Sequence, residues 1–215
     1  MARQRVRIIR DEDPQNPRSW YSVGRLICWH SRYNLGDDHD YDREDFLETL
    51  ACEAEPDFSD RIADLRYDVL NSYTDILCEL NDDSYADNAG VAERQIEERI
   101  KDEAERIVFD KYLMLPVYMY DHSGIALNTT GFACGWDSGF VGWIFCERTA
   151  VDEEFGGDTK KAMACLSAEV EIYSQYVSGD VWGYVLEEEN GIEWECVDSC
   201  WGFYGSDVRV NGMAD

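Results

Sequence analysis

The chain contains few basic residues and no long apolar run. Only 19 of its 215 residues are Lys or Arg, and four of those are lysines, whereas Asp and Glu number 46. No apolar stretch approaches the length of about 18 residues that a membrane-spanning helix needs. The basic first ten residues are not followed by the apolar core of a secretory signal. We therefore expect no membrane span and no secretory signal.

The sequence also lacks the spacings that mark a metal or redox site. None of its eight cysteines forms a C-x-x-C pair, which argues against a zinc ribbon or a thioredoxin-like site. An EF-hand loop beginning at Asp38 would have Arg43 where Gly is needed and Thr49 where the bidentate Glu belongs. His39 and the carboxylates near it are an alternative metal site, but we predict no metal and no cofactor.

The acid surplus restricts the kinds of partner that the chain can bind. The formal net charge is −27, and because four arginines lie in the first ten residues, 15 bases face 46 acids from Asp11 onward. Such a surface repels nucleic acid and anionic membranes, and it attracts basic proteins over a long range at modest salt. We therefore predict no direct nucleic-acid partner, no membrane partner, and a basic protein as the partner.

Composition divides the chain near residue 115. Thirteen of the 16 glycines lie after Tyr120, whereas residues 37–114 show apolar residues at helical spacing. That spacing predicts one helix within residues 42–54, a second after Pro56 and a third past Gly90. We predict a single α+β domain over residues 1–215, with acidic helices (about 37–114) packed on a mixed or mainly antiparallel sheet (about 115–210).

The second part is predicted to be sheet with one helix inserted. Four segments rich in Val, Ile and aromatic residues read as strands, and an early segment, VGRLICWH, is expected to join the same sheet. Asn190-Gly191 lies between two of the strands and predicts a β-hairpin. Residues 159–178 have apolar side chains at helical spacing and are followed by Gly179, which predicts a helix that ends there.

Residues 120–143 concentrate reactive side chains among glycines and aromatics. A Ser or Cys nucleophile needs a base within hydrogen-bond reach and a third group that orients the base. This segment offers those residue types, namely Asp121, His122, Cys134 and Ser138. However, GWDSG places Asp137 where the G-x-S-x-G motif needs Ser. We favour a turn-rich scaffold; the alternative is a small hydrolase-like enzyme with His122 as base and Cys134 or Ser138 as nucleophile.

The densest acidic run lies at residues 37–60, with eleven acids and one arginine. Since duplex DNA carries one charge per about 1.7 Å of its axis, the 27 net charges correspond to roughly 46 Å of duplex. We predict that acidic side chains replace phosphates against a partner's Arg and Lys. The predicted partner-binding residues are Asp37, Asp38, Asp40, Asp42, Glu44, Asp45 and Glu48, with a second patch at Asp82, Asp83 and Asp87. Adaptation to high salt and simple solubility could also account for the acid surplus.

Five blocks of the sequence carry a resemblance to a known family. The blocks SVGRLICWHSRYNLGD, YDHSG, WDSGFVGWIF, SGDVWGYV and DSCWGFYG resemble those of a family of uncharacterised proteins from bacteriophages and mobile elements. The resemblance covers most of residues 20–205, and residues 43–111 look variable within it. It implies a small accessory phage protein that acts in the cytoplasm of a bacterial host, and it supplies no catalytic residues.

These observations lead to one expected function and two alternatives. We expect a phage-encoded inhibitor of a host-defence nuclease, of the anti-CRISPR or antirestriction type, that imitates DNA. Its partner would be a CRISPR effector or a restriction enzyme, and it would not itself be an enzyme. The alternatives are the hydrolase-like enzyme described above and a phage structural or interaction protein.

Overall fold

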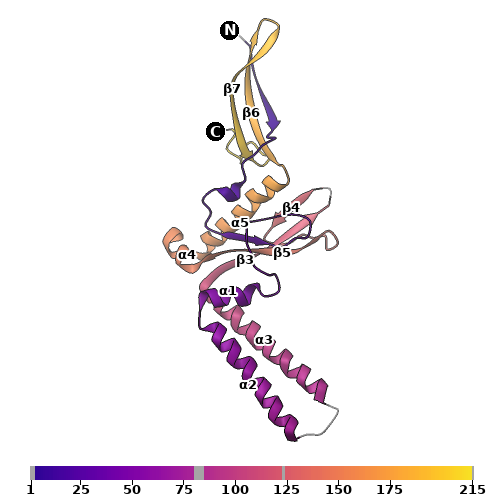
Figure 1. Ribbon diagram of the computed structural model, residues 1–215. Coiled ribbons are helices and arrows are strands. Elements are labelled where there is room, and N and C mark those ends of the chain that lie inside the picture. Colours follow the sequence, from indigo (N-terminus) through magenta and orange to yellow (C-terminus); the bar gives the residue numbers. More distant parts are fainter. Residues whose placement is uncertain (1–2, 80–84, 123, 215) are drawn as a thin grey trace. The chain divides into compact units, whose positions relative to one another are not determined.

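The computed structural model describes residues 3–79, 85–122 and 124–214. Within these ranges, the side chains of residues 69, 70, 72–79 and 85–92 are not described. The chain forms two compact units, which we call the sheet unit (residues 1–38 with 114–215) and the helical unit (residues 39–113) (Figure 1). The α+β class with antiparallel sheets is confirmed. That residues 1–215 form a single domain, whose two units unfold together, stays a prediction.

The helical unit consists of three helices that follow one another in the sequence. They are α1 (Phe46–Ala54), α2 (Phe58–Glu79) and α3 (Tyr85–Lys111), so the third helix begins before Gly90 and not after it. Apolar residues at the predicted spacing form the core, including Phe46, Leu50, Ile100 and Ile107. Two ion pairs, Arg61–Glu103 at 3.1 Å and Arg66–Glu97 at 3.0 Å, show that α2 and α3 run antiparallel.

The sheet unit contains a four-stranded sheet in the order β2-β5-β3-β4. These strands are β2 (Arg25–Cys28), β3 (Tyr112–Asp121), β4 (Ile125–Asn128) and β5 (Ser138–Glu147). Helix α5 (Thr159–Val177) contacts β4 and β5, and α4 (Arg148–Phe155) precedes it. Buried side chains from strand and helix form this core, including Leu26, Ile144, Leu166 and Val170. The predicted helix at 159–178 is confirmed, and α4 was not predicted.

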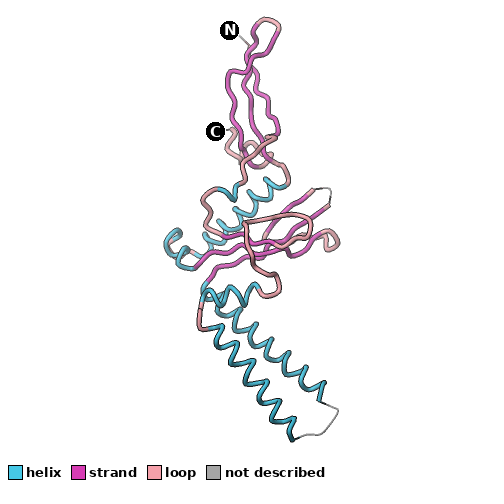
Figure 2. The backbone as a smooth tube through the Cα atoms, in the orientation of Figure 1, coloured by secondary structure: helices cyan, strands magenta, loops and turns pink. Residues whose placement is uncertain are grey.

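A second, three-stranded sheet has the order β1-β6-β7 and is antiparallel throughout. Its strands are β1 (Gln4–Arg10), β6 (Val181–Asn190) and β7 (Glu193–Tyr204) (Figure 2). The predicted hairpin is confirmed. Asn190 pairs with Glu193, so the two-residue loop consists of Gly191 and Ile192 and lies one residue later than expected. The single predicted sheet is therefore two sheets, and the arginine-rich N-terminal segment is a strand of one of them.

Candidate functional site

An exposed acidic segment leads into helix α1 of the helical unit. We define the acidic loop by its four exposed carboxylates, Asp40, Asp42, Glu44 and Asp45. The Asp42 carboxylate accepts a hydrogen bond of 2.8 Å from the backbone N–H of Glu44, which fixes a turn in the way that Asp side chains commonly do. Asp45 directly precedes α1, where a negative charge interacts favourably with the helix dipole. The loop thus holds four charges on a short, ordered stretch.

Two arginines of the helical unit form ion pairs with acids of the same unit. Arg61 pairs with Glu55 at 3.1 Å and with Glu103 at 3.1 Å. Arg66 lies 3.0 Å from Glu97, and that hydrogen bond raises the pKa of Arg66. These guanidinium groups are thus paired mainly with acids outside the acidic loop, although the charge of Asp45 also acts on Arg66 and Arg43 lies within the loop itself.

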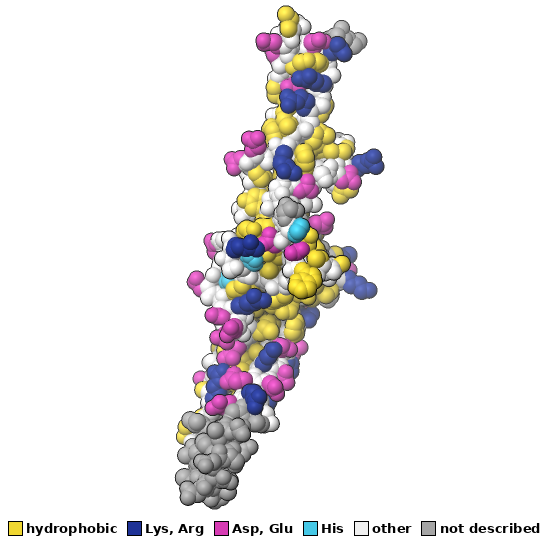
Figure 3. All heavy atoms as spheres, turned by 90° about the vertical axis from the view of Figure 1, so that its right-hand side faces the viewer, with side chains coloured by type: hydrophobic (Ala, Val, Ile, Leu, Met, Phe, Trp, Pro, Cys, Tyr) yellow, Lys and Arg dark blue, Asp and Glu magenta, His cyan; other side chains and the backbone are white. Residues whose placement is uncertain are grey.

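The acids of the helical unit are distributed along two long helices. The unit holds 23 Asp and Glu against eight Lys and Arg in 75 residues. With 27 residues α3 is about 40 Å long, since a helix rises about 1.5 Å per residue. A DNA duplex of that length carries roughly 24 phosphate charges. Figure 3 shows acidic side chains, with basic ones among them, over the described part of these helices.

The predicted partner-binding residues differ in their environments. Asp38 is exposed and belongs to the sheet unit, as Asp37 does. Glu48 is half-buried, and its carboxylate lies 3.7 Å from Arg66. The second predicted patch cannot be placed in the same way. Asp82 and Asp83 lie outside the described residues, and the Asp87 side chain lies outside the described side chains of α3.

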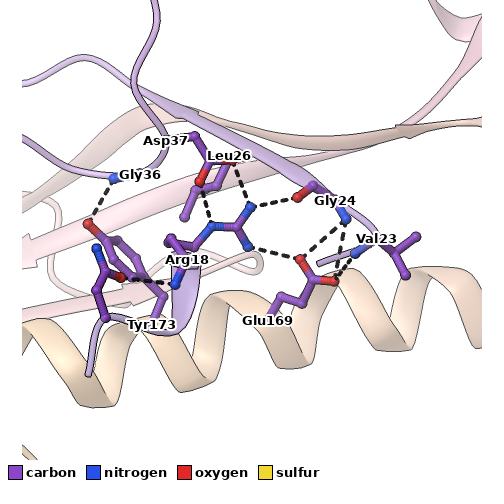
Figure 4. A network of polar contacts seen from close by, with 9 residues as sticks. Arg18, Val23, Gly24, Leu26, Gly36, Asp37, Glu169 and Tyr173 are labelled. Carbon is purple, nitrogen blue, oxygen red and sulfur yellow. Dashed lines mark hydrogen bonds and ion pairs between the residues drawn. The ribbon is translucent and has the colours of Figure 1, made fainter. Parts of the chain in front are cut away.

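Asp37 belongs to an internal network that is centred on Arg18 (Figure 4). Arg18 lies in the short 3-10 helix η1 (Pro17–Ser19), and its side chain is 6% exposed. Its Nε and Nη2 each donate to Asp37 at 2.7 Å, and its Nη1 donates to Glu169 of α5 at 3.0 Å. Nη2 also donates to the carbonyl of Gly24 at 2.6 Å. One buried guanidinium thereby joins four segments of the sheet unit.

The two carboxylates of this network are also bonded to the backbone. Asp37 Oδ2 accepts from the N–H of Leu26 at 2.8 Å, and Glu169 Oε1 accepts from the N–H of Val23 at 2.8 Å. Burial alone would lower the pKa of Arg18, but the bonds and charges of Asp37 and Glu169 outweigh it and raise that pKa. Asp37 is thus bonded within the sheet unit through both of its carboxylate oxygens, and a partner's guanidinium would have to compete with Arg18 for it. Its position in an acidic run gave no sign of this role.

The reactive side chains of residues 121–138 meet at one end of the four-stranded sheet. His122 Nδ1 lies 3.4 Å from Asp137 Oδ2, and Cys134 Sγ lies 3.8 Å from the same oxygen. The Ser138 hydroxyl donates to the carbonyl of Cys134, and Asp121 forms an ion pair with Arg32. The sequence therefore identified residues that do come together in space.

Their order does not correspond to an activated nucleophile. In a nucleophile–base–orienting group arrangement the histidine lies between the nucleophile and the acid, whereas here Asp137 contacts both His122 and Cys134. The Ser138 proton points to a carbonyl and not to His122. The side chain of His122 is 64% exposed, and Cys134 is exposed as well. These contacts stabilise the turns of the segment, and its interpretation as a scaffold stays a prediction.

The described part of the chain offers neither a membrane span nor a metal cluster as a further site. Among residues 3–79, 85–122 and 124–214, no helix combines the length and apolar character that crossing a membrane requires. Among the described side chains, which leave out 69, 70 and 72–92, no three His, Cys, Asp or Glu gather as a metal site would need. Comparisons with protein-family models, curated proteins and solved structures find no match to the chain. The surface that carries the function is therefore inferred from the chain's own charges and contacts.

Proposed function

We propose that the protein binds a basic, nucleic-acid-binding protein through the acidic surface of its helical unit and competes with nucleic acid for that partner. From the resemblance to phage proteins we infer that the partner is a nuclease of a host-defence system, either a restriction enzyme or a CRISPR effector. The site of action would then be the cytoplasm of a bacterial host. The main contacts come from the acidic loop, Asp40, Asp42, Glu44 and Asp45.

The observation that carries the proposal is the distribution of charge within the helical unit. Arg61 and Arg66 are paired with acids of the unit itself, whereas the four carboxylates of the acidic loop are exposed. Carboxylates bind guanidinium groups through short, charge-assisted hydrogen bonds, as phosphates do. A nucleic-acid-binding cleft that is lined with Arg and Lys would therefore accept this surface.

The length of the helices gives the charge a linear arrangement. A globule of evenly spread charge would present only a few carboxylates to a groove, but α2 and α3 extend for 22 and 27 residues. Acids in the described parts of both helices can thus face successive basic residues of an extended cleft. Because exposed charges attract over a distance of about 10 Å at 0.1 M salt, association should be fast at low salt and slower at high salt.

The proposal is tested by titrating the protein against DNA binding and cleavage by a panel of restriction and CRISPR nucleases. The expected result is inhibition of one nuclease at physiological salt, competitive with DNA. Inhibition of every enzyme at low salt and of none at physiological salt would contradict the proposal, because a simple polyanion behaves in that way.

A charge-matched pair of variants locates the surface. The loop variant is Asp40→Asn, Asp42→Asn, Glu44→Gln and Asp45→Asn together. The control removes four exposed acids of the sheet unit: Glu193→Gln, Glu195→Gln, Asp198→Asn and Asp207→Asn. We expect the loop variant to inhibit at least about tenfold less well, because hydrogen bonds between charged groups contribute about 1.5–3 kcal/mol each. Equal inhibition by both variants would overturn the assignment to the loop.

A further inference from the structure

A cavity of about 760 Å³ lies at one end of the three-stranded sheet. The end of β1, the segment that follows it, and the last residues of β7 line this cavity. The side chains of Trp20 and Trp201 both line it and are 43% and 46% exposed, so their rings are accessible from the solvent. All of these residues belong to the sheet unit. The cavity shares no lining residue with the acidic loop or with the cluster around His122.

The backbone of the sheet holds Trp201 in this position. The pairing of β6 with β7 is irregular near this end of the sheet: Trp182 pairs with Phe203, and Tyr184 pairs with Cys200. On β7 two residues, Trp201 and Gly202, therefore lie opposite the single residue Gly183 and form a bulge. A Cβ atom on Gly183 would lie 2.2 Å from Cε3 of Trp201, so the indole ring lies directly on the glycine backbone. Bulges often redirect a side chain in this way near a functional site.

Trp20, the second tryptophan of the cavity, is also held in place. The Trp20 ring packs edge-on against Tyr204, with ring centroids 5.2 Å apart and planes at 86°. The Tyr204 hydroxyl donates to the carbonyl of Gln15, which lies in the same segment as Trp20. The aromatic walls are therefore fixed before any ligand binds, which reduces the entropy cost of binding.

The charged groups of the cavity are mainly acidic. Asp11, Glu12 and Asp13 line it, against one base, Arg10. The Arg10 guanidinium carbon lies 5.5 Å from the ring centroid of Trp182, which is not a wall of the cavity. Asp11 Oδ1 accepts from the N–H of Asp13 at 3.1 Å, which orders this acidic turn. Exposed indole rings beside carboxylates are the features that bind an organic cation.

From this geometry we infer that the cavity binds the guanidinium group of an arginine side chain in a peptide or protein. A guanidinium is planar and stacks on indole rings, and its N–H groups donate in pairs to a carboxylate such as Asp11 or Asp13. A lysine ammonium is a compact, strongly hydrated point charge, and it would gain less from the same walls. The inference does not depend on the proposed function of the helical unit.

The test is calorimetric titration of the full chain with three short peptides at physiological salt. The peptides are identical except for one central residue, which is arginine, lysine or citrulline, the neutral analogue of arginine. The expected result is one arginine peptide bound per chain, with the lysine peptide at least about fivefold weaker and no binding of citrulline. Free arginine amide should bind more weakly than the arginine peptide. Equal binding of arginine and lysine peptides, or of amide and peptide, would overturn the inference.

Matched variants separate this cavity from the general negative charge of the chain. Trp20→Leu should weaken binding of the arginine peptide about five- to tenfold, since one cation–π contact contributes that much. Trp136→Leu, at a 98% exposed tryptophan outside the cavity, should leave binding unchanged.

A second variant tests the carboxylate. Asp11→Asn keeps an acceptor for the Asp13 N–H and should weaken binding about fivefold. Unaltered affinity in both Trp20→Leu and Asp11→Asn would contradict the inference, and the loop variant should bind the peptide normally.

Discussion

Asp37, which binds Arg18, and the acids of the acidic loop belong to the same stretch of sequence, but their environments differ. Asp37 is bonded to Arg18, whose side chain is 6% exposed, and to a backbone N–H. Only three residues later, Asp40 is exposed in the helical unit. Counting acids in a run therefore cannot separate a structural carboxylate from one that is free to bind a partner. Burial and hydrogen-bond partners make that distinction.

The largest expected effect comes from breaking the internal network. Arg18→Met should lower the free energy of unfolding of the sheet unit by about 3–5 kcal/mol, because it leaves the charges of Asp37 and Glu169 without their buried partner. Urea unfolding followed by circular dichroism measures this change. Arg209→Met, at an exposed arginine, is the control and should change stability by less than about 0.5 kcal/mol. A loss below about 1 kcal/mol for Arg18→Met would contradict a central role for this network.

Cys28, which is buried in β2 near the same network, provides a second test. Burial, and then the charge of Asp37, raise the pKa of Cys28 to about 12. The neutral thiol is favoured in the folded state, so its contribution to stability is present below about pH 9 and is lost as the pH rises from about 9 to about 12. At pH 9 we expect alkylation of Cys28 to be at least about 100-fold slower than that of exposed Cys134. The rates are measured by mass spectrometry of labelled peptides. Equal rates would show that the Cys28 side chain in β2 is not buried in solution.

Glu187 of β6 is an intermediate case between the buried network and the acidic loop. Its carboxylate lies 2.6 Å from Arg5 and 3.3 Å from Arg7, and the bond to Arg5 contributes most to lowering its pKa. Stability from this pair is present above the unfolded pKa of Glu and is lost as the pH falls through the lower folded pKa. Glu187→Gln should therefore make the β1–β6 pairing less sensitive to acid. The measurement is the protection of the β1 and β6 amides from hydrogen exchange as the pH falls. The control is Glu193→Gln, an exposed residue of the same hairpin; identical acid profiles for the two variants would contradict this role.

The smallest expected effect on stability is that of the acidic loop. Neutralising its four carboxylates should change the free energy of unfolding by less than about 0.5 kcal/mol per residue, because exposed charges contribute little. A rise in stability is the expected direction, since mutual repulsion of the acids falls. Thermal unfolding of the loop variant and of the charge-matched control measures it. A large loss in the loop variant alone would show that these carboxylates are structural, as Asp37 is.

Local features of the sequence predicted local structure. Regular apolar spacing located α1 and α5, and Asn190-Gly191 located the β6–β7 hairpin to within one residue. The basic segment at 4–10 was not predicted as a strand, because only its pairing with β6, about 180 residues away, makes it one. Helix α4 has only eight residues and was missed as well.

The site was predictable only where neighbours in sequence are also neighbours in space. The loop acids and the cluster around His122 satisfy that condition, and both were named from the sequence. Arg18, Asp37 and Glu169 come from three distant segments and meet only because η1, the β2 region and α5 pack together. The cavity of Trp20 and Trp201 needs the β7 bulge as well. No local pattern encodes either arrangement.

The most direct test of the central claim is the salt dependence of binding between the protein and the nuclease that it inhibits. The dissociation constant would be measured from low to physiological salt for the wild-type chain, the loop variant and the charge-matched control. The account predicts steep weakening with salt for wild type and control, and a clearly shallower dependence for the loop variant, because fewer charges are paired across the interface. The same slope for all three proteins would contradict the claim that the acidic loop replaces phosphates.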